Sequence, residues 1–217
     1  DAAAEFLVVP HYKDADLPIV FCGLNWDASV YGLPFANTTG MVEVTPIPQI
    51  LELLRGHARG GRIGYLAEDS PTKRKELEHH ERIFEIRYDR VWLVTDFAAW
   101  QAAFVEAQDA VDMLVILGVA NVAGWDDAAA AALAREATRI PTGTDFGWLM
   151  HVAAFGVAKS PEEQGVWTAQ AALRILKGAR PASIPLAYNT EAKLYFNPEI
   201  AARLGIRRPP PLAETVR

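Results

Sequence analysis

Cysteine, positive charge and long apolar runs are scarce in this sequence, and each scarcity excludes a class of protein. Cys22 is the only cysteine in 217 residues, so the chain can form no internal disulfide and no CxxC metal or redox site. No uninterrupted apolar run approaches the roughly 20 residues that cross a bilayer, which predicts that the chain itself spans no membrane. The net charge of −6, with no basic stripe, argues against a nucleic-acid partner.

Motifs of catalysis and metal binding are also missing. The sequence has no GxSxG elbow, no GxxxxGK[ST] loop and no GxGxxG after a strand. The adjacent pair His79-His80 does not have the i, i+4 spacing of a helical zinc site, and we interpret it as part of a solvated helix face. We therefore predict a protein that is not an enzyme and that needs no cofactor and no metal. An α/β enzyme that uses Asp145 or Asp96 as a base with His151 remains an alternative, which turnover of a bound compound would support.

Short apolar runs alternate with stretches of helical spacing, and 51% of the residues are hydrophobic. This pattern predicts an α/β protein with a parallel sheet. The expected strands are 18–23, 62–67, 91–95, 113–118 and, more weakly, 139–143.

Capping signals mark the helices. Ser160 precedes a proline and two glutamates and begins a helix that runs to Lys177, and Asn197 begins a short helix in the same way. Ser70 begins another helix at the proline that follows it. An aromatic face at spacings of three and four residues predicts one further helix with a buried side, formed by Phe97, Trp100 and Phe104.

Polar and aromatic residues follow the predicted strands, at the edge where open parallel sheets bind ligands. Their positions predict one ligand site lined by Asn25, Trp26, Asp27, Ser29, Glu68, Asp69, Asp96, Asn121, Trp125, Thr144, Asp145 and Phe146. Polar residues after strands also cap helices, and this second interpretation is favoured for Asp69, Ser70, Asp126 and Asp127. Trp26 and Asp145 begin no obvious helix, so binding and structural roles are weighed evenly there.

Two segments resemble the substrate-binding proteins of ABC transporters, in the group that includes tryptophan- and tyrosine-type binders. The first is PIVFCGLNWDASVYGLP followed by NTTGMVEV. The second and stronger is FGVAKSPEEQGVWTAQAALRILKGARPASIPLAYNTEAKLYFNPEIAARLGI, with its capped helix, its LKG ending, its IP connector and its final LGI.

The resemblance implies a type I periplasmic binding fold, in which two Rossmann-like lobes hold the ligand between them. Lobe one would comprise 1–38 and 156–182, and lobe two 40–153 and 184–217. The first lobe would be incomplete at its N-terminal side, and we expect a processed or shortened chain because no methionine precedes Asp1. Gly40 and Gly156 would ease backbone change at the crossings.

By the same resemblance, Asn25, Trp26 and Asp27 match a polar cleft loop of the family, and Thr144-Asp145 matches its S/T-D pair. The aromatic residues would suit a flat or apolar ligand, and Asp27 and Asp145 would suit an amine.

The function implied is that of a periplasmic or otherwise extracytoplasmic solute-binding protein. It would capture a small molecule, such as an amino acid or an aromatic or carboxylate compound, for the permease of an ABC importer. The alternative is a ligand-binding sensor domain of a signalling receptor, with downstream signalling domains as its partners. A transmembrane span and a kinase segment in flanking sequence would identify a sensor.

Overall fold

The computed structural model describes residues 1–13 and 15–216, and their contacts divide the chain into two compact units. Unit 1 comprises Asp1–Thr45 and Ser160–Glu191, and unit 2 comprises Pro46–Lys159 and Ala192–Arg217. The chain passes from one unit to the other three times. Each passage occurs several residues later in the chain than the lobe boundaries that the sequence predicts.

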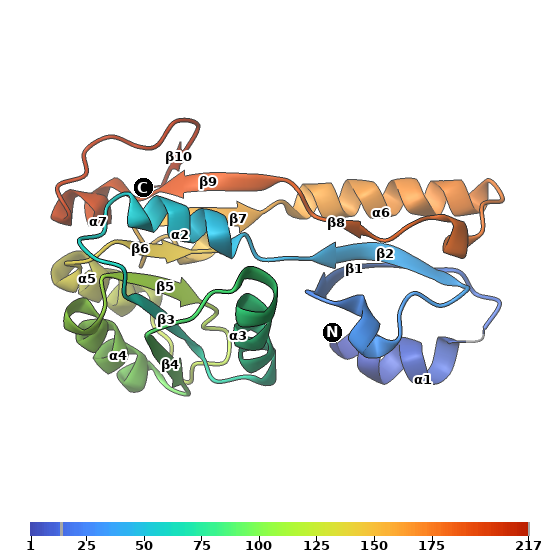
Figure 1. The fold of residues 1–217 in the computed structure, drawn as a ribbon, viewed down its shortest axis with the longest axis horizontal. Coiled ribbons are helices and arrows are strands. Elements are labelled where there is room, and N and C mark those ends of the chain that lie inside the picture. The colour runs from blue at the N-terminus through green and yellow to red at the C-terminus, as the bar shows by residue number, and fades with distance from the viewer. Residues whose placement is uncertain (14, 217) are drawn as a thin grey trace. The chain divides into compact units, whose positions relative to one another are not determined.

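Unit 1 is a small α/β unit (Figure 1). Its sheet has the strand order β1-β2-β8, and both strand pairs are parallel. The small parallel sheet agrees with the predicted α/β class. Its elements are β1 (Ile19–Asn25), β2 (Thr38–Glu43), β8 (Ala187–Tyr188), α1 (Val9–Tyr12), α6 (Pro161–Leu176), a π-helical turn (Ala4–Val8) and two 3₁₀ turns (Ala28–Tyr31 and Pro181–Ser183).

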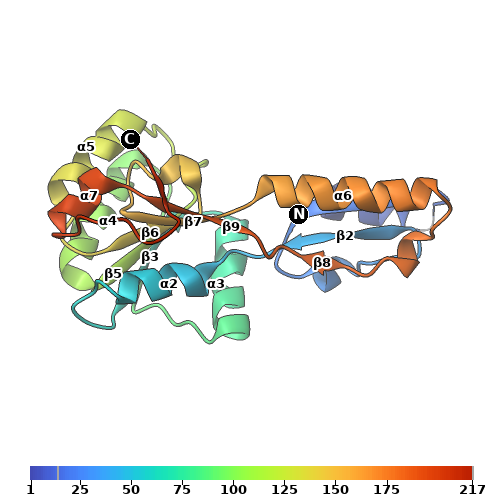
Figure 2. The ribbon, with the colours of Figure 1, turned by 90° about the horizontal axis from the view of Figure 1, so that it is seen from above.

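Unit 2 contains a larger sheet with helices on both faces (Figures 1 and 2). Its strands are β3 (Ile63–Glu68), β4 (Arg90–Val94), β5 (Met113–Leu117), β6 (Thr142–Thr144), β7 (Phe155–Lys159), β9 (Ala192–Phe196) and β10 (Glu214–Thr215). Its helices are α2 (Ile47–Arg55), α3 (Pro71–Phe84), α4 (Phe97–Ala110), α5 (Asp127–Ala137), α7 (Pro198–Arg203) and a 3₁₀ turn (Gly147–Leu149).

The strand order of this sheet is β10-β9-β7-β6-β5-β3-β4, and only the pair β7-β9 is antiparallel. The strands β3 to β7 therefore all end at the same edge of the sheet. This edge, which we call the carboxyl edge, is where ligands bind in open parallel sheets.

The predicted elements are found close to their expected positions. All five predicted strands are present. The most weakly predicted one, 139–143, lies at Thr142–Thr144, and Ile140 and Pro141 precede it in the loop. The three predicted caps accept hydrogen bonds as expected: Ser70 from the Lys73 amide, Ser160 from the Glu163 amide and Asn197 from the amides of Glu199 and Ile200. The starts of these three helices are therefore determined by residues that are neighbours in the sequence.

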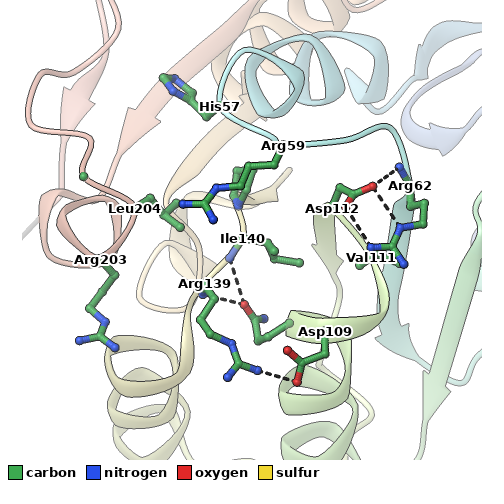
Figure 3. A pocket seen from close by; sticks show the side chains of 13 residues that line it. His57, Arg59, Arg62, Asp109, Val111, Asp112, Arg139, Ile140, Arg203 and Leu204 are labelled. Atoms are coloured by element: carbon green, nitrogen blue, oxygen red, sulfur yellow. Dashed lines mark hydrogen bonds and ion pairs between the residues drawn. The ribbon is translucent and has the colours of Figure 1, made fainter.

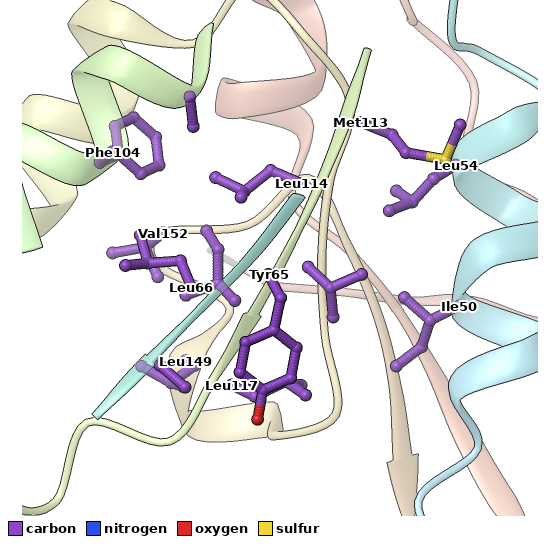
Figure 4. Packing of buried hydrophobic residues seen from close by; sticks show 14 of the residues in the cluster. Ile50, Leu54, Tyr65, Leu66, Phe104, Met113, Leu114, Leu117, Leu149 and Val152 are labelled. Atoms are coloured by element: carbon purple, nitrogen blue, oxygen red, sulfur yellow. The ribbon is translucent and has the colours of Figure 1, made fainter. Parts of the chain in front are cut away.

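The core of unit 2 lies on both sides of β3 and β5 (Figure 4). On one side Phe104 of α4 packs, and on the other side Ile50 and Leu54 of α2 pack, and all three side chains are fully buried. The predicted aromatic face of α4 is confirmed, since the ring of Trp100 stacks on Phe97 and Phe104 with centroid distances of 6.0 and 5.2 Å. Both faces are apolar, which explains the uninterrupted apolar runs of β3 and β5.

Candidate functional site

Four predicted site residues of unit 2 lie at the carboxyl edge of its sheet. Glu68 is the last residue of β3, and Asn121 lies in the loop after β5. Thr144 is the last residue of β6, and Asp145 directly follows it. Glu68 accepts hydrogen bonds from the backbone amide of Asn121 at 2.6 Å and from its side-chain amide at 3.2 Å. Thr144 and Asp145 are buried, and Asp145 is only 1% exposed. These strand ends and loops bring carboxylate, amide and hydroxyl groups to the carboxyl edge.

Two lysines outside the predicted set of site residues lie at the same edge. The ammonium nitrogen of Lys73, in the first turn of α3, lies 2.7 Å from Glu76 Oε2, and the side chains of this pair are only 7% and 4% exposed. Lys159, the last residue of β7, places its ammonium nitrogen 3.8 Å from Asp145 Oδ2. Burial lowers the pKa of Lys73, but Glu76 and Asp145 outweigh burial and raise it, so Lys73 remains a cation.

Phe146 gives the site an aromatic surface. The ammonium groups of Lys73 and Lys159 lie 5.5 and 5.6 Å from its ring centroid, at cation–π distance. Trp148, an exposed residue, lies beside Phe146 with a centroid distance of 5.3 Å. The carboxyl edge thus holds two lysine–carboxylate pairs and a ring, groups that can bind charged ligand atoms and an apolar or flat part.

His79 and His80 lie in a buried, hydrogen-bonded part of unit 2, contrary to the prediction. Both histidines are buried, so the predicted solvated face is wrong. His80 Nδ1 lies 2.7 Å from the Tyr88 hydroxyl, and the Tyr65 hydroxyl lies 3.5 Å from Glu76 Oε1. The physical reason is that α3 turns a polar face towards Tyr65 of β3 and towards Tyr88 in the loop before β4. Burial lowers the pKa of His80 to about 3, so the imidazole is neutral.

The buried face of α3 carries a signal that sequence analysis missed. Lys73, Glu76 and His80 lie at i, i+3 and i+7, the spacing of a core-facing stripe. The stripe consists of polar residues, so a search for apolar periodicity does not find it. No three His, Cys, Asp or Glu side chains in residues 1–13 and 15–216 are grouped so that they could hold a metal ion.

Three other predicted site residues of unit 2 contact the helices α3 and α4. Asp96 caps α4 by accepting a hydrogen bond from the Ala99 amide at 2.9 Å. Trp125 packs edge-on against Trp100 with a centroid distance of 4.9 Å. Asp69 pairs with Arg74 at 2.7 Å, at a more exposed position. These contacts give all three residues a structural role.

The capping interpretation holds for two of the four residues to which it was applied. Ser70 caps α3, and Asp126 caps α5. Asp69 and Asp127 are not caps: Asp127 occupies the first helical position and accepts a hydrogen bond from the Trp125 indole at 2.7 Å.

The remaining predicted residues belong to unit 1. The Asn25 side chain donates to Asp1 Oδ2 at 2.8 Å, and Asp27 caps a 3₁₀ turn by accepting from the amide and the hydroxyl of Ser29. Trp26 has a φ of 69° and is 4% exposed. The loop after β1 is thus a compact turn that carries a buried tryptophan.

In the described part of the chain, every helix is too short or too polar to cross a membrane. The sequence model of a family described as ABC transporter substrate binding protein matches residues 98–215, more than half of the chain. No curated protein is similar enough in sequence to be matched to it.

Solved structures share its fold. A substrate binding protein with adhesive properties from Clostridium difficile, in a ligand-free, open structure, is 18% identical, with a TM-score of 0.69 over 94% of this chain and 72% of that one. An ABC domain in complex with L-tryptophan from Streptococcus pneumoniae is 18% identical, with a TM-score of 0.63 over 93% and 74%. A conserved domain protein from Vibrio cholerae is 19% identical, with a TM-score of 0.56 over 83% of this chain and 63% of that one, which is less than two thirds of its length.

Proposed function

Because the chain belongs to the family of ABC transporter substrate binding proteins, we propose that it captures a small molecule outside the cytoplasm and delivers it to the permease of an ABC importer. The observation that carries the proposal for this chain is the carboxyl edge of unit 2. Buried lysines, carboxylates and an aromatic ring converge there at the ends of parallel strands. Ligand capture by such proteins needs binding groups and a change of conformation, and no bond is made or broken.

We propose further that the ligand is an amino acid or an aromatic carboxylate. The ammonium groups of Lys73 and Lys159 favour a carboxylate, and the ring of Phe146 favours a flat apolar part. Asp145 already lies beside Lys159, so an amine of the ligand would share this carboxylate with the lysine. L-tryptophan is the first compound to test, since a protein of similar fold binds it.

The experiment that tests this function begins with the purified protein. Mass spectrometry of small molecules released from it, together with a thermal-shift screen of amino acids and small carboxylates, identifies ligands that raise the melting temperature. Binding to the folded state alone raises stability by mass action. If no compound of either class stabilises the protein, the proposed ligand class is wrong.

Asp145→Asn tests the site itself. We expect it to weaken binding of the best ligand from the screen about tenfold or more, since loss of a buried charged partner costs more than about 1.4 kcal/mol. Glu106→Gln, which removes the charge of an exposed residue on α4, is the matched control and should bind like wild type. Isothermal titration calorimetry measures both. If Asp145→Asn binds as tightly as Glu106→Gln, the carboxyl edge of unit 2 is not the site.

A sensor domain of a signalling receptor would use the same binding groups. The two roles differ in the event that binding triggers, which is transfer to a permease in one case and a signal in the other. Uptake of the ligand by cells that carry or lack the gene separates them, because loss of a transport protein abolishes uptake and loss of a sensor does not.

A further inference from the structure

A pocket lies at the edge of the sheet of unit 2 opposite to the carboxyl edge, where the strands begin. Its volume is about 550 Å³, and its lining includes residues that directly precede β3, β5 and β6. Figure 3 shows this pocket. Strands of five or six residues are roughly 17–20 Å long, so this pocket is separate from the carboxyl edge. The ligand site proposed above makes no use of it.

The charge of the lining is opposite in sign to that of the protein as a whole. Four arginines and only two aspartates line the pocket, whereas the whole chain has a net charge of −6. The arginines are Arg59, Arg62, Arg139 and Arg203, and the aspartates are Asp109 and Asp112. The lining thus carries positive charge in excess.

Two of the arginines are already matched by the two aspartates. Arg62 donates two hydrogen bonds to Asp112 at 3.0 and 3.1 Å and one to the Ala110 carbonyl at 2.8 Å. Arg139 pairs with Asp109 at 2.7 Å. The contact of Arg62 with the last residue of α4 is also the contact that a helix C-terminus favours. These two guanidinium groups have structural roles.

The other two arginines form no ion pair with a carboxylate of residues 1–13 and 15–216. Arg203 donates to the Glu136 carbonyl near the end of α5, at 2.9 Å. Arg59 makes no hydrogen bond or ion pair with any residue in 1–13 and 15–216, and Figure 3 shows it reaching into the pocket from the loop after α2. Hydrogen bonds to carbonyl groups near helix C-termini account for the positions of the Arg62 and Arg203 side chains. They do not account for the position of Arg59.

The loop that carries Arg59 is held in place. A Cβ at the next residue, Gly60, would lie 2.7 Å from the carboxyl carbon of Asp112, so only glycine lets the loop lie this close to Asp112. Arg62, at the end of the loop, is fixed on the same carboxylate by its backbone amide at 2.8 Å. The position of Arg59 is therefore set by the surrounding structure.

We infer that this pocket binds a compact oxyanion with at least two negative charges, a phosphate group or a small polycarboxylate, with Arg59 as its main contact. Guanidinium groups recognise both classes through paired hydrogen bonds, and an anion would balance the excess positive charge of the lining. The site would be independent of solute capture at the carboxyl edge.

The test titrates the whole protein with inorganic phosphate and, in a second series, with citrate, at constant ionic strength. Backbone amide shifts in NMR spectra are followed at Arg62, Asp112 and Gly205. We expect saturable shifts at these residues, and the anion that binds more tightly identifies the class. Arg59→Gln should weaken binding about tenfold. Arg174→Gln removes the same charge from an exposed position of α6 and should leave binding unchanged.

Three results would overturn the inference. They are shifts that do not saturate for either anion, equal weakening by Arg59→Gln and Arg174→Gln, and saturable shifts that Arg59→Gln leaves unaltered. Arg59 is exposed, so loss of its side chain should leave the fold intact, which the unshifted spectrum of the rest of the variant verifies.

Discussion

Lys73 and Glu76 form an ion pair that is nearly inaccessible to water. Such a pair stabilises little by itself, because removing two charges from water offsets most of their attraction. Removal of only one partner nevertheless lowers the stability strongly, since the remaining charge stays buried without its partner. Burial raises the pKa of the Glu76 carboxyl, and Lys73 opposes that rise.

Lys73→Met should therefore lower the free energy of unfolding by about 3–5 kcal/mol at neutral pH. Urea denaturation measures the loss. The double variant Lys73→Met/Glu76→Gln should recover part of it, because no charge is left without its partner. Arg74→Met breaks the more exposed pair with Asp69 on the same helix and should cost less than about 1 kcal/mol. Equal losses for the two single variants would contradict this account of burial.

His80 makes stability depend on pH. Its pKa is about 3 in the folded protein, against 6.5 for an ordinary histidine. Between these values the unfolded chain binds more protons, so the free energy of unfolding falls as the pH is lowered from 6.5 towards 3. The full effect is on the order of a few kcal/mol.

His80→Gln keeps an oxygen that can accept from Tyr88 but removes the titrating group. We expect the stability of wild type relative to this variant to decline steadily as the pH falls from 7 to 4, as measured by urea denaturation at each pH. Taking the difference between the two proteins cancels the opposite effect of the Glu76 carboxyl. His11→Gln, at an exposed position, should follow the wild-type profile. Parallel profiles for wild type and His80→Gln would show that His80 does not cause the pH dependence.

At the scale of elements, side-chain caps set where the helices begin. The helix α6 starts at Pro161, and its cap Ser160 accepts from the Glu163 amide at 3.2 Å. This hydrogen bond satisfies one of the amides that a helix start leaves without an intrahelical partner. Proline at the first helical position has no amide to satisfy.

Ser160→Ala should destabilise α6 by about 1 kcal/mol. Amide hydrogen exchange in the first turns of α6 measures the loss locally, and urea denaturation measures it globally. Ser160→Asn keeps a side-chain acceptor and should stay within a few tenths of a kcal/mol of wild type. If the alanine and asparagine variants exchange at the same rate, the cap contributes nothing.

Two glycines expected to ease movement have another role in their strands. A Cβ at Gly156 in β7 would lie 2.5 Å from the sulfur of Met150, and a Cβ at Gly40 in β2 would collide with the ring of Phe21. Both glycines permit close packing of neighbouring side chains. This packing gives a structural reason for glycine at both positions.

At the scale of the whole molecule, the division into two units with three passages between them suits ligand capture by closure. We expect a saturating ligand from the screen to reduce the radius of gyration in small-angle X-ray scattering. The variant Asp145→Asn, at a ligand concentration that saturates only the wild type, serves as the control and should keep the unliganded value. Identical scattering of wild type with and without a saturating ligand would argue against closure.

The sequence by itself determined the α/β class, the strands of both units that it predicted and the starts of three helices. These features depend on neighbours along the chain: apolar runs make buried strands, and Ser70, Ser160 and Asn197 cap the helices that begin directly after them. The family resemblance came from the same local pattern. The positions of Glu68, Thr144 and Asp145 at strand ends were also predicted, because strand ends can be read from the sequence.

Only the tertiary structure decided which charges are buried and which residues meet. Lys73, Glu76 and His80 look like part of an exposed charged helix in the sequence, yet all three are buried. Glu76 contacts Tyr65, and His80 contacts Tyr88. Arg59 becomes distinctive only because Asp112 and Asp109 match other arginines. Burial and pairing depend on contacts between residues far apart in the chain, and the free energy of a charge depends on those contacts, so no local pattern encodes them.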